Sequence, residues 1–488
     1  MTSEAIVHRT VVVHLLCILI SVPVAGKPLP HRADSICGFS IYRTAHRLAS
    51  DEFQGRLSGH AGYNAAAAWV ADMFQSWGVK PADGQQGYLL PFPIQYTLVS
   101  DAAMSLFLPD ETGETDFREM TLEPEKDFLP LLFSDTADRT AEIAFIGWGI
   151  HAPELGYDDY FGVDVAGKFV MCFRGTPDPE NTAYQHHDQH RTRMQRAKDA
   201  GALGLIYIYK EPIANPNGDW IEGFTPVNIS FAAADHLLAE RGSCSTSLRA
   251  DLLKYRRPIS FELRAKARIR VESTHVSQAT GYNVVGYIEG TDLRLRDEAV
   301  VVGAHLDHCG THMGLLFGGA DDNASGSAVV IEIARALAEN RIRTDRSVLF
   351  ALFGAEEMGL IGSRHLASHF PDRFTTISHM INFDMVGAGD GSRCGYSASH
   401  TDLKELVEDV DRHVGTVRSM FPIRQLGVRG SDHAPFHAKG IPVLYFASNG
   451  PHLKYHTTGD TIYRINPHIM QDIARIGYLL TLELATKQ

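Results

Sequence analysis

The clearest pattern along the chain begins near residue 280, where short apolar runs alternate with amphipathic stretches. The apolar runs are typical of buried strands, and they cover residues 282–290, 299–307, 347–354, 380–387 and 441–448. The stretch 325–340 has helical period, because its apolar residues share one face: Val329, Ile333, Ala336 and Leu337. Strands that alternate with helices predict an α/β fold, in which a mixed, mainly parallel and buried central sheet is flanked by helices.

The pattern of the first half of the chain predicts a second unit inserted into this α/β domain. Residues 62–77 form an alanine-rich helical stretch that Gly78 ends as a typical C-cap. A looser passage follows, and then three apolar runs read as strands of a small separate sheet: 141–150, 167–175 and 202–209. The predicted organisation is a divided main domain and a β-rich insert: residues 27–130 and 269–488 for the main domain, and residues 131–268 for the insert.

Residues 1–26 read as a secretory signal peptide. A single early base, Arg9, precedes an apolar core, and the segment ends in small residues. The core is shorter than the roughly 20 residues of a membrane span; an uncleaved anchor or a buried strand is the alternative. Because no second stretch is long enough to cross a bilayer, we expect an exported protein, secreted or periplasmic. Cleavage is expected near residue 26, with no membrane attachment in the mature form.

Composition narrows the class of protein only slightly. The chain has 488 residues, of which 44% are hydrophobic and 21% charged, which is ordinary for a globular protein. Its net charge of −13 and its pI near 6.0 argue against nucleic acid as a partner. The cysteines show neither a disulfide framework nor a C-x-x-C zinc pattern.

Ionisable residues collect at the carboxyl ends of the predicted strands, where open α/β sheets bind their ligands. They are His305 and Asp307, Asp321 and Asp322, Glu356 and Glu357, Asp384, and further on His456. Each group alone has an ordinary explanation, such as a helix N-cap or a solvated helix start. Together they would repel one another without a cation, and imidazole with carboxylate suits zinc, with manganese or cobalt as chemical alternatives. The number of ligands predicts two Zn²⁺ per chain that share a bridging carboxylate.

Glu356 and Glu357 follow an apolar strand directly. Neighbouring residues in a strand point to opposite faces, so both can serve one site only if the strand has ended and the backbone turns. Gly354 is expected to permit that turn, because glycine adopts left-handed backbone at low cost.

These segments resemble the di-zinc aminopeptidase family of clan MH, whose fold is shared by glutamate carboxypeptidase and the transferrin receptor. The matching motifs are GAHLDHCG, GADDNASGSA, FALFGAEEMGLIGS, INFDMVG, SDHAPFHAKGIP and YHTTGDT. The segments GYDDYFGVDVAGKFVMCFRG and AKDAGALGLIYI resemble a protease-associated (PA) domain. The resemblance covers nearly all of the chain after the signal segment. It implies a zinc exopeptidase fold of the phosphorylase/hydrolase-like kind with an inserted PA domain.

The resemblance also implies a role for each matching residue. Five residues would bind zinc: His305 and Asp384 one ion, Glu357 and His456 the other, and Asp322 both. Glu356 would be the general base for attack by a metal-bridging water, and Tyr455 would stabilise the oxyanion. Asp307 would hold His305 in orientation. Asp432 and His433 match a motif near the substrate pocket, which makes them candidates for substrate binding, with a structural role as the alternative.

The expected function is that of an exported di-zinc aminopeptidase that removes N-terminal residues from peptides with a free N-terminus. A carboxypeptidase or dipeptidase with the same chemistry stays open, because the sequence does not place the group that holds the terminal charge of the substrate. The alternative of a different class is a catalytically inactive, receptor-like binding protein. Such relatives have lost metal ligands, whereas this chain keeps all five.

Overall fold

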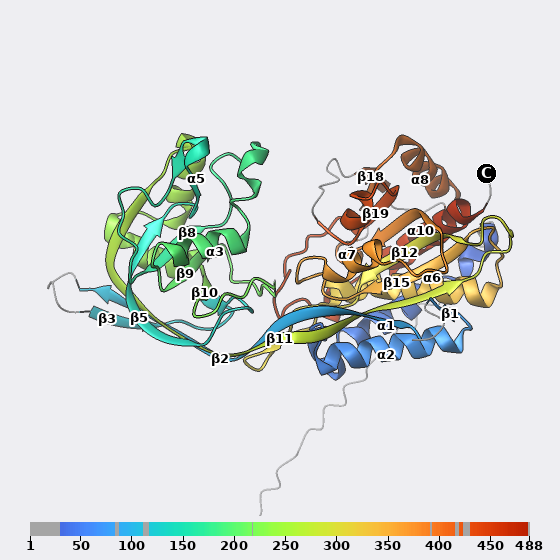
Figure 1. Ribbon diagram of the computed structural model, residues 1–488, viewed down its shortest axis with the longest axis horizontal. Helices are drawn as coiled ribbons and strands as arrows, with labels where there is room; N and C mark the ends of the chain where they lie inside the picture. The colour runs from blue at the N-terminus through green and yellow to red at the C-terminus, as the bar shows by residue number, and fades with distance from the viewer. Residues whose placement is uncertain are drawn as a thin grey trace, which may run out of the picture.

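The computed structural model describes residues 30–82, 87–110, 117–216, 218–390, 393–414, 419–422 and 430–486. They form two lobes that are joined by a long two-stranded ribbon (Figure 1). The ribbon pairs β2 (Leu89–Pro109) with β11 (Ser260–Ile288) in antiparallel register. We call residues 99–271 the insert lobe and the rest the main lobe.

A mixed sheet lies at the centre of the main lobe, with four parallel strands in its middle. In spatial order these are β15 (Ser347–Phe353), β12 (Glu298–His305), β16 (Thr376–Phe383) and β19 (Val443–Ser448). Antiparallel neighbours extend the sheet on both sides. On one side β11 lies beside β15, and β1 (Lys80–Pro81) pairs with β11. On the other side β17 (Arg393–Ala398) lies beside β19, and β18 (Ser419–Pro422) pairs with β17. The sequence of the central strands is almost continuously apolar because both faces of the sheet are covered.

Helices cover both faces of this sheet. One face packs against α1 (Gly38–Leu48), α2 (Ala61–Ser76), α6 (Gly326–Asn340), α8 (Thr401–Val414) and α10 (Pro467–Ala485). The other face packs against α7 (Ile361–Ser368) and α9 (His433–His437). Helix α6 is the predicted helix 325–340, and its four predicted core residues are at most 2% exposed. Gly78 has the left-handed φ of +74° that is expected just beyond the end of α2. The predicted α/β class is confirmed.

The insert lobe has a small sheet and a core of its own. Its parallel strands are β5 (Ala137–Ile146), β8 (Phe169–Phe173), β9 (Gly204–Tyr209) and β10 (Thr225–Ser230), with β4 (Phe128–Pro130) antiparallel at one edge. Around them lie β3 (Phe117–Thr121), α3 (His190–Asp199), α4 (Phe231–Leu238) and α5 (Ser245–Tyr255). Strand β11 pairs with β5, so one sheet runs through both lobes. Met104, Leu106 and Phe128, which precede residue 131, share the core of this lobe.

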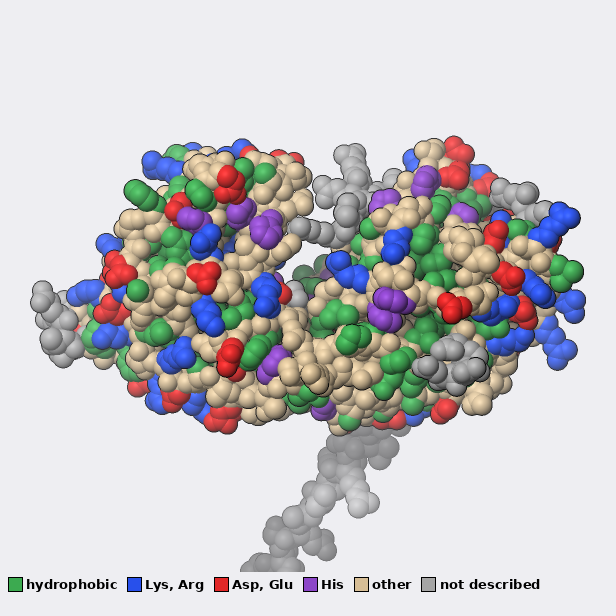
Figure 2. Space-filling model, in the orientation of Figure 1, with side chains coloured by type: hydrophobic (Ala, Val, Ile, Leu, Met, Phe, Trp, Pro, Cys, Tyr) green, Lys and Arg blue, Asp and Glu red, His purple; other side chains and the backbone are tan. Residues whose placement is uncertain are grey.

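The surface is hollowed between the two lobes (Figure 2). Two short hairpins are separate from the large sheet: β6 (His151–Ala152) with β7 (Tyr157–Asp158), and β13 (Gly310–His312) with β14 (Leu315–Phe317). Within the described part of the chain, no helix is both long and apolar enough to cross a bilayer. The predicted signal peptide, residues 1–26, lies outside the described residues.

Candidate active site

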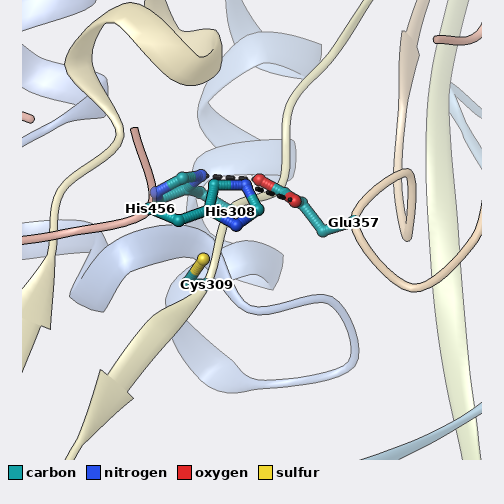
Figure 3. Close-up of side chains that lie close together, drawn as sticks. All are labelled: His308, Cys309, Glu357 and His456. Carbon is teal, nitrogen blue, oxygen red and sulfur yellow. Dashed lines mark hydrogen bonds and ion pairs between the residues drawn. The ribbon is translucent and has the colours of Figure 1, made fainter. Parts of the chain in front are cut away.

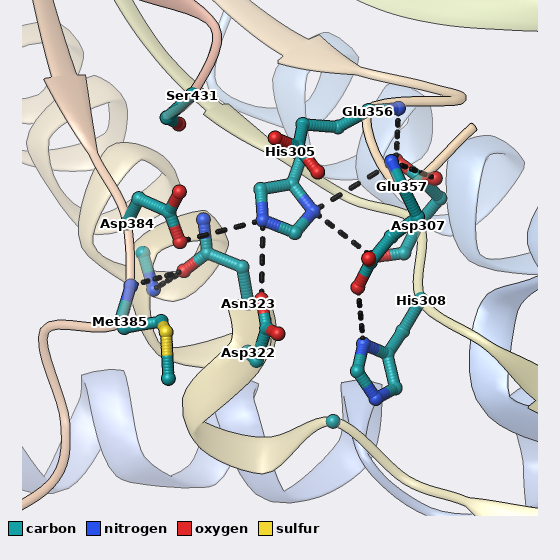
Figure 4. A network of polar contacts seen from close by, with 12 residues as sticks. His305, Asp307, His308, Asp322, Asn323, Glu356, Glu357, Asp384, Met385 and Ser431 are labelled. Atoms are coloured by element: carbon teal, nitrogen blue, oxygen red, sulfur yellow. Dashed lines mark hydrogen bonds and ion pairs between the residues drawn. The ribbon is translucent and has the colours of Figure 1, made fainter. Parts of the chain in front are cut away.

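The five predicted metal ligands lie together at the carboxyl ends of the central strands (Figures 3 and 4). His305 is the last residue of β12, and Asp384 directly follows β16. Asp322 lies in the short turn Ala320–Ser325 that leads into α6, whereas Glu357 and His456 lie in the loops after β15 and β19. Their side chains are between 1% and 9% exposed. The topology therefore gathers residues that are far apart in the sequence into one buried cluster.

Asp322 stands between two groups of donors. Its Oδ1 lies 3.3 Å from His305 Nε2, and its Oδ2 lies 3.2 Å from His456 Nε2. We call the first group, which is completed by Asp384 Oδ1 at 3.4 Å from His305 Nε2, the first pole. We call the second group, which is completed by Glu357 Oε2 at 3.0 Å from His456 Nε2, the second pole. Tetrahedral zinc with N and O ligands at 2.0–2.1 Å separates its ligand atoms by about 3.3 Å, so each pole has the dimensions of a zinc site.

The electrostatics of the cluster also fit a bound cation. Asp384 Oδ1 and His456 Nε2 are buried and form no hydrogen bond with the described residues. Buried polar atoms are normally satisfied, and buried carboxylates are normally paired. Burial raises the pKa of Glu356, and the neighbouring Asp432, Glu357 and Asp384 add to the effect. A metal at each pole would use the unsatisfied atoms and neutralise the carboxylates.

The backbone turn that carries the two glutamates differs from the sequence prediction in its detail. The left-handed residue is Ala355, with φ of +54°, and not Gly354. Gly354 is needed for space instead, because a Cβ there would lie 2.6 Å from both the Tyr282 carbonyl oxygen and the Tyr63 hydroxyl. A left-handed alanine is a mildly strained conformation of a kind found at functional sites. The strand does end before the pair, as predicted.

Asp307 contacts both the first pole and the glutamate pair. His305 Nδ1 lies 3.2 Å from the Asp307 backbone oxygen and 3.8 Å from its carboxylate Oδ1. The same carboxylate accepts hydrogen bonds from the backbone N–H groups of Glu356 and Glu357, at 3.1 and 3.4 Å. The carboxylate of Asp307 therefore holds the turn of the glutamates, and its backbone oxygen is the nearer partner of the imidazole.

Tyr455 and Glu356 border the cluster on the side of the cleft. The ring of Tyr455 stacks on His456 at a centroid distance of 3.8 Å and an angle of 16°, and the side chain is 43% exposed. Glu356 is half-buried and can place a carboxylate oxygen near His305 and Glu357. Both residues are thus within reach of a substrate in the cleft.

Asp432 and His433 lie behind the metal ligands, at the start of α9. Both are buried, at 0% and 4% exposed, and the His433 ring packs on Tyr445 at 4.7 Å. Burial raises the pKa of Asp432 to about 7 and lowers that of His433 to about 4. Neither lines the cleft between the lobes.

Two further residues, which sequence reasoning missed, hold the loops and side chains of the cluster in place. The fully buried Arg56 donates to the backbone oxygens of four residues on three separate segments: Leu48, Leu306, Gly318 and Gly319. His308, also fully buried, has its Nδ1 2.8 Å from Glu357 Oε1 (Figure 3). The only signal for His308 in the sequence was its place in the motif HLDHCG. Arg56 carried no signal, because three of its four partners are 250 to 263 residues away.

Asp321 and Asp322 are neighbours but make different contacts, which the sequence did not show. Asp321 accepts hydrogen bonds from the N–H groups of Gly387 and Ala388 and lies 2.6 Å from His452 Nδ1. It ties its turn to the loop after β16 and faces away from the poles. Asp460 accepts from the backbone N–H of Asp322 at 3.0 Å and so fixes the bridging residue from behind.

A cleft of about 750 Å³ opens onto the second pole and is lined by both lobes. From the main lobe it receives Glu356, Tyr455 and His456, and from the insert lobe Arg174, Arg191 and Asp219. A cleft of this size is within the range of ligand-binding sites.

The chain is similar to several known proteins. Residues 283–480 match peptidase family M28. Aminopeptidase YwaD of Bacillus subtilis is 26% identical over 349 residues, which cover 68% of this chain and 66% of the relative. The chain spans between 36% and 66% of the length of the first curated relatives that it matches.

Two solved structures share the fold over nearly their whole length. An aminopeptidase from Aneurinibacillus sp. strain AM-1 has a TM-score of 0.67 at 22% identity, over 94% of this chain and 96% of that one. BSAP, a zinc aminopeptidase from Bacillus subtilis, has a TM-score of 0.59 at 21% identity, over 93% and 96%. The motifs, the donor cluster and the comparisons agree: residues 283–480 match peptidase family M28, and the chain shares the fold of these two aminopeptidases.

Proposed function

We propose that the protein is a zinc-dependent aminopeptidase that hydrolyses the N-terminal peptide bond of its substrates. The observation that carries the proposal is the position of Asp322, whose two carboxylate oxygens each face a different histidine. One carboxylate shared by two donor groups is the arrangement expected for two metal ions that act on one bond. The names of the relatives support the same activity, since YwaD and both solved structures are described as aminopeptidases.

Zinc is the metal that fits the donors best. The two poles offer imidazole and carboxylate, and zinc accepts such sets with tetrahedral geometry. The Cys309 thiol lies beside the second pole, but burial raises its pKa, which keeps it protonated. Two bound zinc ions would polarise the scissile carbonyl and lower the pKa of an attacking water to about 7. The BSAP structure, which shares the fold, is described as a zinc aminopeptidase.

The protein's own residues then carry the proton and hold the charge. Glu356 takes the proton of the attacking water and returns it to the leaving amine. Its raised pKa suits this role, because burial makes the carboxylate a stronger base than an exposed glutamate. The hydroxyl of Tyr455 donates to the oxyanion that develops on the scissile carbonyl. The Asp307 carboxylate accepts a hydrogen bond from the Glu356 backbone N–H and so keeps Glu356 in place.

The insert and the export of the protein belong to the same proposal. The insert lobe supplies one wall of the cleft, so we assign it as a protease-associated domain that helps to bind the peptide. The segment 1–26 is assigned as a signal peptide that directs export. Peptides with a free N-terminus are the proposed substrates.

Replacing the two adjacent glutamates separately tests the assignment of roles. Glu356→Gln should keep two zinc ions per chain and lose about 10²–10⁴-fold in kcat, because only proton transfer is removed. Glu357→Ala should instead lower zinc occupancy, because it removes a ligand of the second pole. Zinc content by elemental analysis and kcat are measured on the same samples. Full activity of Glu356→Gln at full metal content would refute the role of Glu356.

The direction of cleavage is tested with matched peptides. The protein should release N-terminal residues from aminoacyl-nitroanilides and from peptides with blocked carboxyl ends. Peptides with a blocked amino end should not be cut. Cleavage of amino-blocked peptides only would show a carboxypeptidase, and a requirement for both free ends would show a dipeptidase.

A further inference from the structure

The loop that carries His456 is held by the insert lobe through its backbone. The Ala214 N–H donates to the His456 backbone oxygen at 2.8 Å, and His456 Nδ1 lies 2.9 Å from the Ala214 backbone oxygen. Ala214 is fully buried and lies between β9 and β10 of the insert lobe. The contact therefore joins a predicted metal ligand of the main lobe to a segment 242 residues earlier in the chain.

This contact fixes the protonation of the imidazole. A carbonyl oxygen only accepts hydrogen bonds, so Nδ1 of His456 must carry the proton. In the neutral ring, which is the form that binds a metal, the lone pair is then on Nε2, which faces Asp322 and Glu357 at the second pole. Metal-bound histidines usually need such a partner on the other ring nitrogen, and losing it typically weakens metal binding 10–100-fold.

The two poles obtain this partner from different lobes. At the first pole, His305 Nδ1 meets the backbone oxygen of Asp307, which belongs to the same lobe and the same strand end. At the second pole, the partner comes from the insert lobe. Separation of the lobes would thus leave the first pole intact and disturb the second.

A second contact braces the same loop. The carboxylate of Glu125 accepts from the backbone N–H of Thr458 at 3.1 Å and from its hydroxyl at 2.9 Å. Glu125 is half-buried in the turn between β3 and β4 of the insert lobe, and its own N–H donates to the Phe128 backbone oxygen. Thr458 is two residues beyond His456, so these two hydrogen bonds limit the movement of the predicted metal ligand.

We propose that Glu125 and Ala214 are positioning residues for the second metal pole, and that closure of the insert lobe and zinc binding at this pole are one coupled equilibrium. The inference rests on the proposed zinc site. Coupling of this kind is reciprocal: a closed insert lobe strengthens zinc binding at the second pole, and zinc at that pole favours the closed arrangement. The first pole is linked to this equilibrium only through the shared Asp322, because the partner of His305 lies in the main lobe.

The first test compares zinc binding by the full-length protein and the variant Glu125→Ala, with a chelating indicator dye as competitor. One of the two zinc ions should bind about tenfold more weakly in the variant, and the other should bind as in the unchanged protein. Glu125→Gln should lie between them, because its amide oxygen still accepts one hydrogen bond. Glu123→Ala is the matched control, since Glu123 is exposed in the same turn and its carboxylate pairs with the exposed Lys126; it should bind both ions normally.

Thr458→Val, on the other side of the contact, separates positioning from a general loss of stability. It should weaken the same zinc ion, and the double variant with Glu125→Ala should be less than additive. Hydrogen exchange of residues 209–216 gives the reciprocal measurement, and zinc loading should slow it. If Glu125→Ala binds both ions as Glu123→Ala does, or if zinc leaves this exchange unchanged, the inference is wrong while the proposed function stands. If the unchanged protein binds no zinc, both are wrong.

Discussion

Arg56 shows how one side chain can set the geometry of a site that it does not enter. Its guanidinium is fully buried and joins the loop after β12 to the turn before Asp322 through carbonyl oxygens. Burial lowers its pKa to about 10, so it stays charged at neutral pH and balances the carboxylates above it. The planar fork of donors is what reaches several carbonyls at once, and a lysine lacks it.

We therefore expect Arg56→Lys to destabilise the protein by about 3 kcal/mol or more, because hydrogen bonds to a charged group contribute about 1.5–3 kcal/mol each. Denaturant unfolding followed by circular dichroism measures the loss. Arg43→Lys is the control, because Arg43 is exposed on α1; its effect should stay within about 0.5 kcal/mol. Equal effects of the two changes would contradict the role given to Arg56.

His308 makes the second prediction at the scale of the residue. Burial lowers its pKa, so the ring is neutral and its Nδ1–H donates to Glu357 Oε1. That bond leaves Oε2 free to face the second pole. His308→Ala should weaken one zinc ion about 10–100-fold. His308→Asn should restore much of the affinity, because its amide can donate from nearly the same position. A zinc titration in which the two variants agree would speak against this hydrogen bond.

At the scale of the element, the turn after β5 in the insert lobe depends on a single buried carboxylate. Asp159 accepts from the N–H groups of Trp148 and Ile150 and from the Tyr157 hydroxyl, at 3.0–3.1 Å. Burial raises its pKa to about 7. A carboxyl group with a raised pKa in the folded state holds its proton more tightly there than in the unfolded chain, where the pKa is about 3.9. Its stabilising effect is present in acid and is lost as the pH rises from about 4 to about 7.

Asp159→Asn should remove this pH dependence, because an amide does not titrate and can satisfy the same three partners. The unchanged protein should lose up to roughly 4 kcal/mol relative to the variant between pH 4 and pH 8. The fluorescence of the buried Trp148 reports unfolding of this lobe. Parallel stability curves for the two proteins would show that Asp159 is not the titrating group.

At the scale of the whole molecule, the metal site and the lobe arrangement depend on each other. The core of the main lobe carries, at its strand ends, the neighbouring carboxylates of Asp322, Glu356, Glu357 and Asp384, which repel one another when no cation is present. The insert lobe has a separate core and reaches the site through Ala214 and Glu125.

Removal of zinc by a chelator should therefore destabilise the main lobe, by about 2.7 kcal/mol when zinc had been present at 100 times its Kd. Hydrogen exchange should quicken most in the loops that end β12, β15, β16 and β19, whereas the core of the insert lobe should change little. Scanning calorimetry with and without added zinc measures the total effect, and zinc should reverse it. Equal quickening of exchange in both cores would contradict the separation of the two lobes.

Much of the fold follows from patterns that are local in the sequence. Helix α6 and the four central strands were predicted within a few residues because burial on both faces makes their apolar runs continuous. The ribbon of β2 and β11 was not predicted. These two strands join both lobes, and the alternation of buried and exposed residues along them resembles that of several shorter strands.

The sequence by itself determined the donor types, their places at strand ends, and the match of residues 283–480 to peptidase family M28. A strand end is recognisable locally, so its polar residue can be assigned before the fold is known. Only the tertiary structure decided how these donors are held, by Arg56 at Leu306, His308 at Glu357 and Ala214 at His456. Such contacts join segments that no local pattern relates, and two of the three use backbone oxygens, which every residue carries. That is the physical reason why the clustering of these donors could be predicted from the sequence and the contacts that hold them could not.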